Sequence, residues 1–168
     1  MSAGLEKVLQ AVAGYLSGRG VPAATAWPAG PRQEREGPLV LVSLRGCRVE
    51  PSGFQNYLGE SFDQEGGRWT ECYGKKVRLT LGLDIYAPEK EGGDMVQSAF
   101  DALAAALLLE GPEGLDLLEL SCGETARDGG SRRLRRPAQA VFSAFLWAGG
   151  DMEGGVFTDF ELRGVVKQ

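Results

Sequence analysis

Residues 73–109 read YGKKVRLTLGLDIYAPEKEGGDMVQSAFDALAAALLL, and this stretch decides the fold. Its first half alternates apolar and polar residues, and successive side chains of a β-strand point to opposite faces. The spacing therefore predicts a strand that ends at Ala87-Pro88. One face of this strand is apolar and consists of Val77, Leu79, Leu81, Leu83 and Ile85. The other face is polar and carries Lys76, Arg78, Thr80 and Asp84.

The second half of the same stretch changes to helical spacing. Its apolar stripe consists of Val96, Ala99, Phe100, Leu103, Ala104 and Leu107. We expect Asp94 to cap the N-terminus of this helix and Gly111-Pro112 to stop it. A second amphipathic helix is predicted over residues 5–16, where apolar residues again recur at helical spacing.

The segments on either side of this stretch predict further strands. Residues 39–44 (LVLVSL) are a short apolar run between Pro38 and Gly46, which is typical of a central strand buried on both faces. The proline-rich segment before them, residues 21–38, is expected to be a loop without a regular hydrogen-bond ladder. Three more strands, separated by glycine turns, are predicted over residues 115–122, 138–148 and 156–163.

Residues 57–62 and 68–73 predict the two arms of a hairpin around Gly66-Gly67. The hairpin carries four aromatic residues, Tyr57, Phe62, Trp69 and Tyr73. They can anchor a protein interface or pack back onto the parent sheet, and the sequence allows both interpretations. Four carboxylates lie in the same segment, Glu60, Asp63, Glu65 and Glu71. These indicate a hydrated surface, a cation site or a catalytic pair.

The order of these elements is helix, strand, hairpin, strand, helix and three strands. Consecutive strands with short connections favour antiparallel pairing. We therefore expect an α+β fold in a single domain spanning residues 1–168. Its sheet would be mainly antiparallel with about five strands, two main helices would pack on one face, and the hairpin would project. The face without helices is then a candidate for subunit contact.

The only concentrated basic segment lies between two of the predicted strands. Its arginines are Arg127, Arg132, Arg133, Arg135 and Arg136. They can form a solvated hairpin tip, a contact with an acidic protein or a contact with nucleic acid. The net charge of the chain is −5, and an acidic chain is a poor binder of phosphate backbones and of anionic membranes.

Composition narrows the chemistry further. The chain has no histidine, which excludes Ser-His-Asp and Cys-His mechanisms and histidine-ligated metals. Its three cysteines, Cys47, Cys72 and Cys122, are too far apart for a disulfide framework or a C-x-x-C zinc pair. No cofactor or metal is expected. The N-terminus lacks the basic region of a signal peptide, and no run of 18 apolar residues occurs, so we expect folding in a cytoplasm.

Taken together, the sequence resembles the small tail terminator, or tail completion, proteins of tailed phages and related contractile particles. The segments that carry the resemblance are LVLVSLRGC, NYLGESFD, WTECYGKKVRLTLGLDIYAP, DMVQSAFDALAAALL and VFTDFELRG. The resemblance covers nearly the whole chain, as an order of elements preceded by an amphipathic helix and a proline-rich loop.

The resemblance implies a structural virion protein and not an enzyme. Such proteins close into a ring, typically a hexamer, on the last ring of the tail tube, where they stop tube growth and offer a surface for head attachment. The implied partners are further copies of the chain, the tail tube protein, and in some particles the sheath and the neck or connector protein. DNA would only pass through the lumen. The implied location is the tail or neck of a virion assembled in a bacterial cytoplasm.

The surfaces that such a ring would use are a hypothesis from the residues discussed above. We predict that subunit or partner contacts involve Tyr57, Phe62, Trp69, Tyr73, Lys76, Arg78, Asp84, Arg132, Arg133, Arg135 and Arg136. Two other functions stay open at this point. The chain can be another neck or head–tail connector protein of the same particle, or a small enzyme that uses carboxylates such as Glu60 and Asp63.

Overall fold

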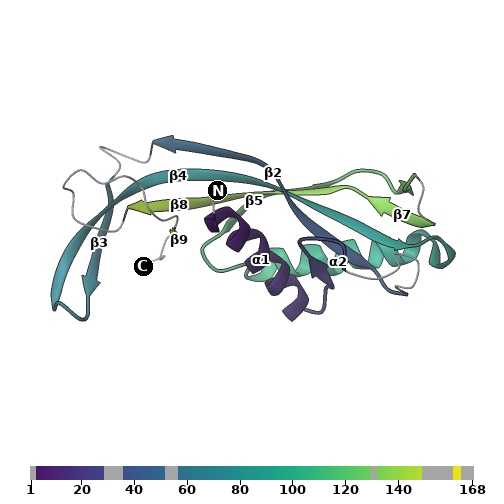
Figure 1. Cartoon of the computed structure of the whole chain (residues 1–168), viewed down its shortest axis with the longest axis horizontal. Coiled ribbons are helices and arrows are strands. Elements are labelled where there is room, and N and C mark those ends of the chain that lie inside the picture. Colours follow the sequence, from purple (N-terminus) through teal and green to yellow (C-terminus); the bar gives the residue numbers. More distant parts are fainter. Residues whose placement is uncertain (1–2, 29–35, 52–56, 130–131, 149–160, 164–168) are drawn as a thin grey trace.

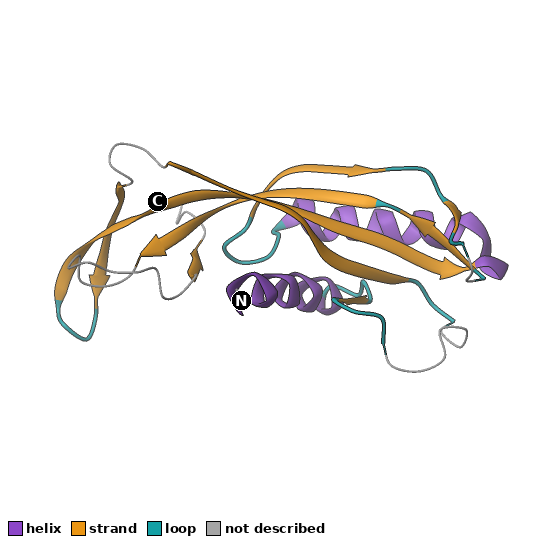
Figure 2. Ribbon diagram, turned by 45° about the horizontal axis from the view of Figure 1, so that its top comes forward, coloured by secondary structure: helices purple, strands orange, loops and turns teal. Residues whose placement is uncertain are grey.

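The computed structural model describes residues 3–28, 36–51, 57–129, 132–148 and 161–163. Two helices, α1 (Ala3–Gly18) and α2 (Gly92–Leu109), pack against a mixed sheet. Figures 1 and 2 show the arrangement. The predicted turn near residues 149–155 and most of the predicted last strand lie outside the described residues.

The sheet consists of five long strands and four short ones within the described residues. The long strands are β2 (Leu39–Pro51), β3 (Tyr57–Asp63), β4 (Arg68–Pro88), β5 (Asp116–Cys122) and β8 (Ala138–Ala148). The short strands are β1 (Ala23–Ala24), β6 (Ala126–Arg127), β7 (Arg133–Arg136) and β9 (Glu161–Arg163). All described pairings are antiparallel except that of β1 with β2. The expected α+β class, with about five principal strands, is confirmed.

The 21-residue strand β4 is the spine of the sheet. On one side it pairs with β2 and then with β3, and on the other side with β7 and then with β8. The predicted hairpin arm (68–73) and the predicted alternating strand are therefore one element. Gly74 does not interrupt it, because β8 continues alongside through the pair Tyr73–Ala148.

Strand β2 differs from its prediction. It does not end before Gly46 but continues to Pro51, because a bulge between Leu44 and Gly46 absorbs the irregularity and pairing with β4 resumes. Nor is it buried on both faces throughout, since Leu44 is 39% and Val49 51% exposed. Beyond Leu41, the described residues give β2 a neighbour on one edge only, and this leaves its second half open.

The proline-rich segment also departs from expectation. Ala23 and Ala24 pair with β2 in parallel, and the amide of Val40 donates to the carbonyl of Pro22 at 2.8 Å. A short ladder therefore forms where none was expected. The prolines flank this two-residue strand without occupying it, so both of its own amides remain available. The part of the predicted loop at residues 29–35 lies outside the described residues.

Both helices cover the same face of the sheet (Figure 1). The odd-numbered positions of β4 from Val77 to Ala87 are almost fully buried and point toward the helices. They meet Val12 and Leu16 of α1 and Leu103 of α2 in one hydrophobic core. We call the opposite side of the sheet the helix-free face. In the described part of the chain, neither helix lies on it.

Helix α2 begins three residues earlier than predicted. Its N-cap is Glu91, which makes no side-chain capping bond, and Asp94 lies inside the first turn. The reason is the preceding 3-10 turn, η2 (Glu89–Glu91), which leads the chain directly into the helix. Asp94 still favours the helix electrostatically, because a carboxylate in the first turn complements the positive end of the helix dipole.

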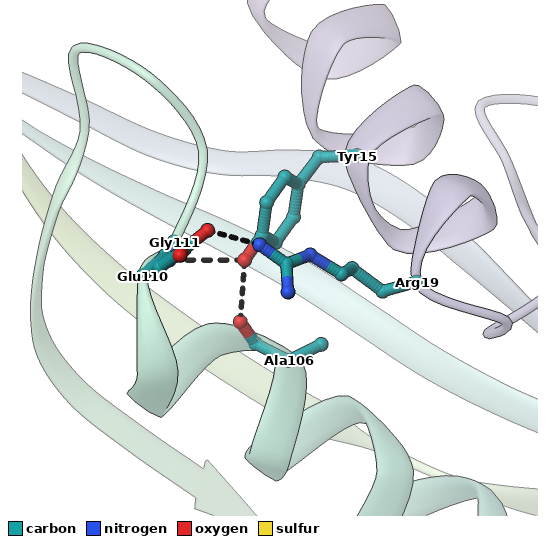
Figure 3. A network of polar contacts seen from close by, with 5 residues as sticks. All are labelled: Tyr15, Arg19, Ala106, Glu110 and Gly111. Atoms are coloured by element: carbon teal, nitrogen blue, oxygen red, sulfur yellow. Dashed lines mark hydrogen bonds and ion pairs between the residues drawn. The ribbon is translucent and has the colours of Figure 1, made fainter.

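Tyr15 connects the two helices (Figure 3). Its hydroxyl donates to the carbonyl of Ala106 at 2.7 Å and accepts from the amide of Gly111 at 3.0 Å. Next to it, the guanidinium of Arg19 lies over the Tyr15 ring and forms an ion pair with Glu110. The end of α2 is therefore fixed against α1 by groups from both helices.

The molecule is elongated along the direction of β4 (Figure 1). The β3–β4 hairpin lies at one end, where β4 curves toward the side of the helices, and β7 lies at the opposite end (Figure 1). The predicted projection of the hairpin is therefore present.

Candidate functional site

The predicted polar face of β4 lies on the helix-free face. Of its members, Arg78 is exposed, whereas Lys76 and Thr80 are half-buried. Asp84 behaves differently, because the residue is only 7% exposed. A carboxylate removed from water is costly unless charged partners surround it. The surroundings of Asp84 therefore define the first candidate site.

Two arginines hold Asp84 from neighbouring strands. Arg45 of β2 and Arg135 of β7 each donate from Nη2 to Oδ2 of Asp84, at 2.8 and 2.9 Å. We call these three residues the arginine clamp. The hydrogen bond to Asp84 raises the pKa of Arg135 above its ordinary value. With two cations and one anion, the clamp has a formal charge of +1.

Glycine at position 82 makes room for the clamp. A Cβ at this position would lie 2.4 Å from Nε of Arg45 and 2.6 Å from Oγ of Ser43. Arg45 sits in the β2 bulge, next to the point where the register shifts. The bulge and the missing side chain together let Arg45 reach across β4 to Asp84.

The clamp forms one wall of a shallow hollow of about 350 Å³. Its lining is partly polar and partly apolar, with residues from β2, β4, β5 and the segment where β7 leads into β8. The lining residues are Arg45, Asp84, Ser121, Cys122, Gly123, Arg135, Pro137, Ala138 and Gln139. Two atoms of the clamp, Oδ1 of Asp84 and Nε of Arg135, are buried and have no hydrogen-bond partner among the described residues.

The remaining arginines of the basic segment are not a uniform solvated tip. Arg133 is 4% exposed, and its guanidinium lies 4.8 Å from the centre of the Trp27 ring. Trp27 in turn meets Tyr86 edge to face at 5.2 Å, and burial raises the pKa of Tyr86. The Trp27 ring thus covers part of the helix-free face, which the sequence did not indicate.

Of the other arginines in the basic segment, some contact neighbouring side chains and one is exposed. Arg136 donates from Nε to Thr125 at 2.9 Å and from Nη1 to Gln97 at 2.6 Å. Arg127 forms an ion pair with Glu89, and Arg132 is exposed. The idea of a solvated tip is therefore wrong for Arg133, Arg135 and Arg136, because packing and hydrogen bonds hold them in place.

The aromatic residues of the hairpin form a second candidate site, at the other end of β4. They make two cross-strand pairs, Tyr57 with Tyr73 at 5.6 Å and Phe62 with Trp69 at 5.3 Å between ring centres. Tyr57 is 44%, Phe62 48% and Trp69 66% exposed. The interpretation that these three rings pack back onto the parent sheet is therefore wrong. They stabilise each other across the hairpin and remain accessible.

Two glutamates lie between the aromatic pairs. Glu60 and Glu71 are directly opposite each other in the β3–β4 register. The hydroxyl of Tyr73 donates to Oε2 of Glu71 at 2.6 Å, and this bond raises the pKa of Tyr73. We define Tyr57, Glu60, Phe62, Trp69, Glu71 and Tyr73 as the acidic aromatic patch. It lies on the side of the sheet opposite Lys76 and Arg78, because odd and even positions of β4 point to opposite faces.

The structure brings some of the predicted site residues together in two separate groups, and it leaves Lys76, Arg78, Arg132, Arg133 and Arg136 outside both. Asp84 and Arg135 come together in the clamp, while the four aromatic residues gather on the hairpin. Arg45 was not predicted, although the break in alternation at Leu44-Arg45-Gly46 was a signal for a bulge. The predicted carboxylate pair of Glu60 and Asp63 lies partly outside the described residues, because the side chain of Asp63 is not among them.

No group of three or more Cys, Asp or Glu side chains in the described residues is placed to hold a metal ion. No helix in that part of the chain is long and apolar enough to cross a membrane. No protein-family model matches the chain, and no curated protein sequence is significantly similar to it.

Proposed function

We propose that this chain is a structural assembly protein that closes into a ring. The proposal rests on one observation: a single long strand, β4, contributes to two different surfaces. The acidic aromatic patch lies on the β3–β4 hairpin and the arginine clamp lies beside β7, and the two groups point to opposite faces of the sheet. The hairpin and β7 are at opposite ends of the molecule (Figure 1). Cyclic rings use such heterologous contacts, in which one patch of a subunit meets a different patch of the next.

The exposed aromatic rings support this proposal. Aromatic residues are enriched at the centres of protein interfaces, where they bury a large area at little cost in side-chain entropy. Trp69 and Phe62 form a pair at the end of a projecting hairpin, and each exposes about half or more of its surface. A hairpin of this kind is suited to reach a neighbouring subunit.

The resemblance in sequence supplies the biological setting. On that basis we propose that the ring caps the tail tube of a phage or related contractile particle, ends tail growth and provides the surface for head attachment. The tail tube protein would be its first partner. A net charge of −5 suits a ring through which DNA slides without binding, because an acidic lumen repels the phosphate backbone.

The test is the mass and shape of the purified chain. Multi-angle light scattering should give a multiple of the mass of one chain, near six, and negative-stain images should show closed rings. Mixed with isolated tail tubes, the rings should sit at one tube end. A persistent monomer that neither forms rings nor adds to tubes would contradict the proposal, and rings that bind only head connectors would assign the chain to the neck.

A further inference from the structure

The arginine clamp holds polar groups that its own fold leaves without partners. Asp84 is more than nine-tenths buried and is one of the residues that line the hollow, and its Oδ1 has no hydrogen-bond donor among the described residues. Nε of Arg135 has no acceptor there. A buried polar atom without a partner costs free energy, so an occupant of the hollow gains by supplying one donor and one acceptor together.

The clamp also presents positive charge at the mouth of the hollow. The side chains of Arg45 and Arg135 are 45% and 37% exposed, although each contacts Asp84. With one carboxylate between two guanidiniums, a formal charge of +1 remains to attract an anion. An acidic occupant therefore fits the site electrostatically.

The acidic aromatic patch offers the complementary groups. Glu60 and Glu71 are acceptors that face each other across two strands, and like charges in that position repel. A guanidinium placed beside them would relieve this repulsion. Trp69 adds an indole N–H donor on a ring that is 66% exposed. The patch therefore carries carboxylates, a donor and aromatic faces for stacking on arginine.

We propose that the acidic aromatic patch of one copy docks into the hollow at the arginine clamp of the next copy. This inference rests on the proposed ring. In it, Glu60 and Glu71 approach the guanidiniums of Arg45 and Arg135, and the indole of Trp69 supplies a donor to Asp84. The patch and the clamp lie toward opposite ends of the molecule, so each copy can give one contact and receive another without closing a two-fold dimer.

Disulfide trapping tests this docking directly. A cysteine-free chain carrying Cys47→Ser, Cys72→Ser and Cys122→Ser is the background. Glu71→Cys marks the patch, and Ser121→Cys marks the rim of the hollow on the same face as Asp84. Under mild oxidation this pair should give a ladder of covalent oligomers on a non-reducing gel. The matched control combines Glu71→Cys with Ser98→Cys, which is exposed on α2, and should remain monomeric on the gel.

Charge reversal gives a second, independent readout. Glu60→Lys with Glu71→Lys changes only the patch, and it should raise the concentration needed for half-assembly by about tenfold or more, because lysines then face the clamp. Glu6→Lys with Glu113→Lys makes the same change in net charge at exposed positions outside the patch, and should assemble like the unmodified chain.

The outcomes separate this inference from the ring itself. Rings that form normally but give no ladder, or that tolerate the lysine pair, overturn the docking and leave the proposed ring standing. A ladder that stops at dimers shows reciprocal two-fold pairing and also overturns it. If the unmodified chain forms no ring at all, both proposals fall.

Discussion

Asp84 shows how one residue can set requirements on several others. Its burial requires cationic partners, and those partners come from strands 39 and 51 positions away along the chain. Arg45 reaches Asp84 only because Gly82 has no side chain. The polar alternation around position 84 predicted that Asp84 lies on an open face available for subunit contact, since a sequence pattern does not contain the distant strands that cover it. The alternation of apolar and polar residues along β4 was therefore predictable from the sequence, and the burial of Asp84 was not.

Gly82→Ala tests this dependence. The added methyl group would collide with Arg45, so we expect a loss of about 1–2 kcal/mol in the free energy of unfolding as Arg45 is displaced from Asp84. The cost should shrink in an Arg45→Ala background, because the collision with Arg45 is then absent and only the contact with Oγ of Ser43 remains, so the two changes are not additive. Urea denaturation of the two single variants and the double variant measures the coupling.

The matched control is Gly46→Ala. Its Cβ would meet only Thr80 at 3.9 Å, which is ordinary contact, so the change should cost no more than a few tenths of a kcal/mol. Equal losses at both glycines, or full additivity with Arg45→Ala, would show that Gly82 serves the strand and not the clamp.

At the scale of elements, a helix or strand was predicted correctly where its own residues determine it, and less well where a distant partner does. Helix α2 and strands β4 and β8 follow from their own apolar periods, and the β3–β4 turn follows from its glycines. The length of β2 depends on its partner β4, which carries the pairing past Gly46. The contact of Tyr15 with Ala106 joins residues 91 positions apart, and no local pattern indicates it.

Tyr15→Phe should weaken the connection between the helices. The change removes a donor to Ala106 and an acceptor for Gly111, both partly buried, while it keeps the ring. We expect a loss of about 1–3 kcal/mol in the free energy of unfolding, measured by urea denaturation. Arg19→Ala removes the neighbouring exposed ion pair and should cost less than about 1 kcal/mol. The reverse order of these losses would contradict the role given to the hydroxyl.

At the scale of the whole molecule, β4 connects the two candidate sites. It contributes Trp69, Glu71 and Tyr73 to the patch and Asp84 to the clamp, so the two sites are held by one continuous strand. Pairing with β2 on one side and β8 on the other stiffens the segment between them. A neighbour bound at one site is therefore positioned relative to the other, as a ring of fixed curvature requires.

Arg78 lies between the two sites and tests whether the open part of the helix-free face also takes part in assembly. It is exposed and stands directly opposite Arg48 in the β2–β4 register. Arg78→Glu should leave the monomer folded, with an unchanged or slightly higher melting temperature, because it replaces a cross-strand repulsion with an attraction. If a neighbour contacts this face, the same change should weaken ring formation, as measured by light scattering across a dilution series.

The control for this prediction is Lys7→Glu, which reverses a charge at an exposed position on α1. It alters the net charge of the chain by the same amount and should leave assembly unchanged, so a difference between the two variants reports on position 78 and not on overall charge. Rings that survive Arg78→Glu as well as they survive Lys7→Glu would show that this part of the helix-free face is solvated. The subunit contacts would then be confined to the two ends of β4.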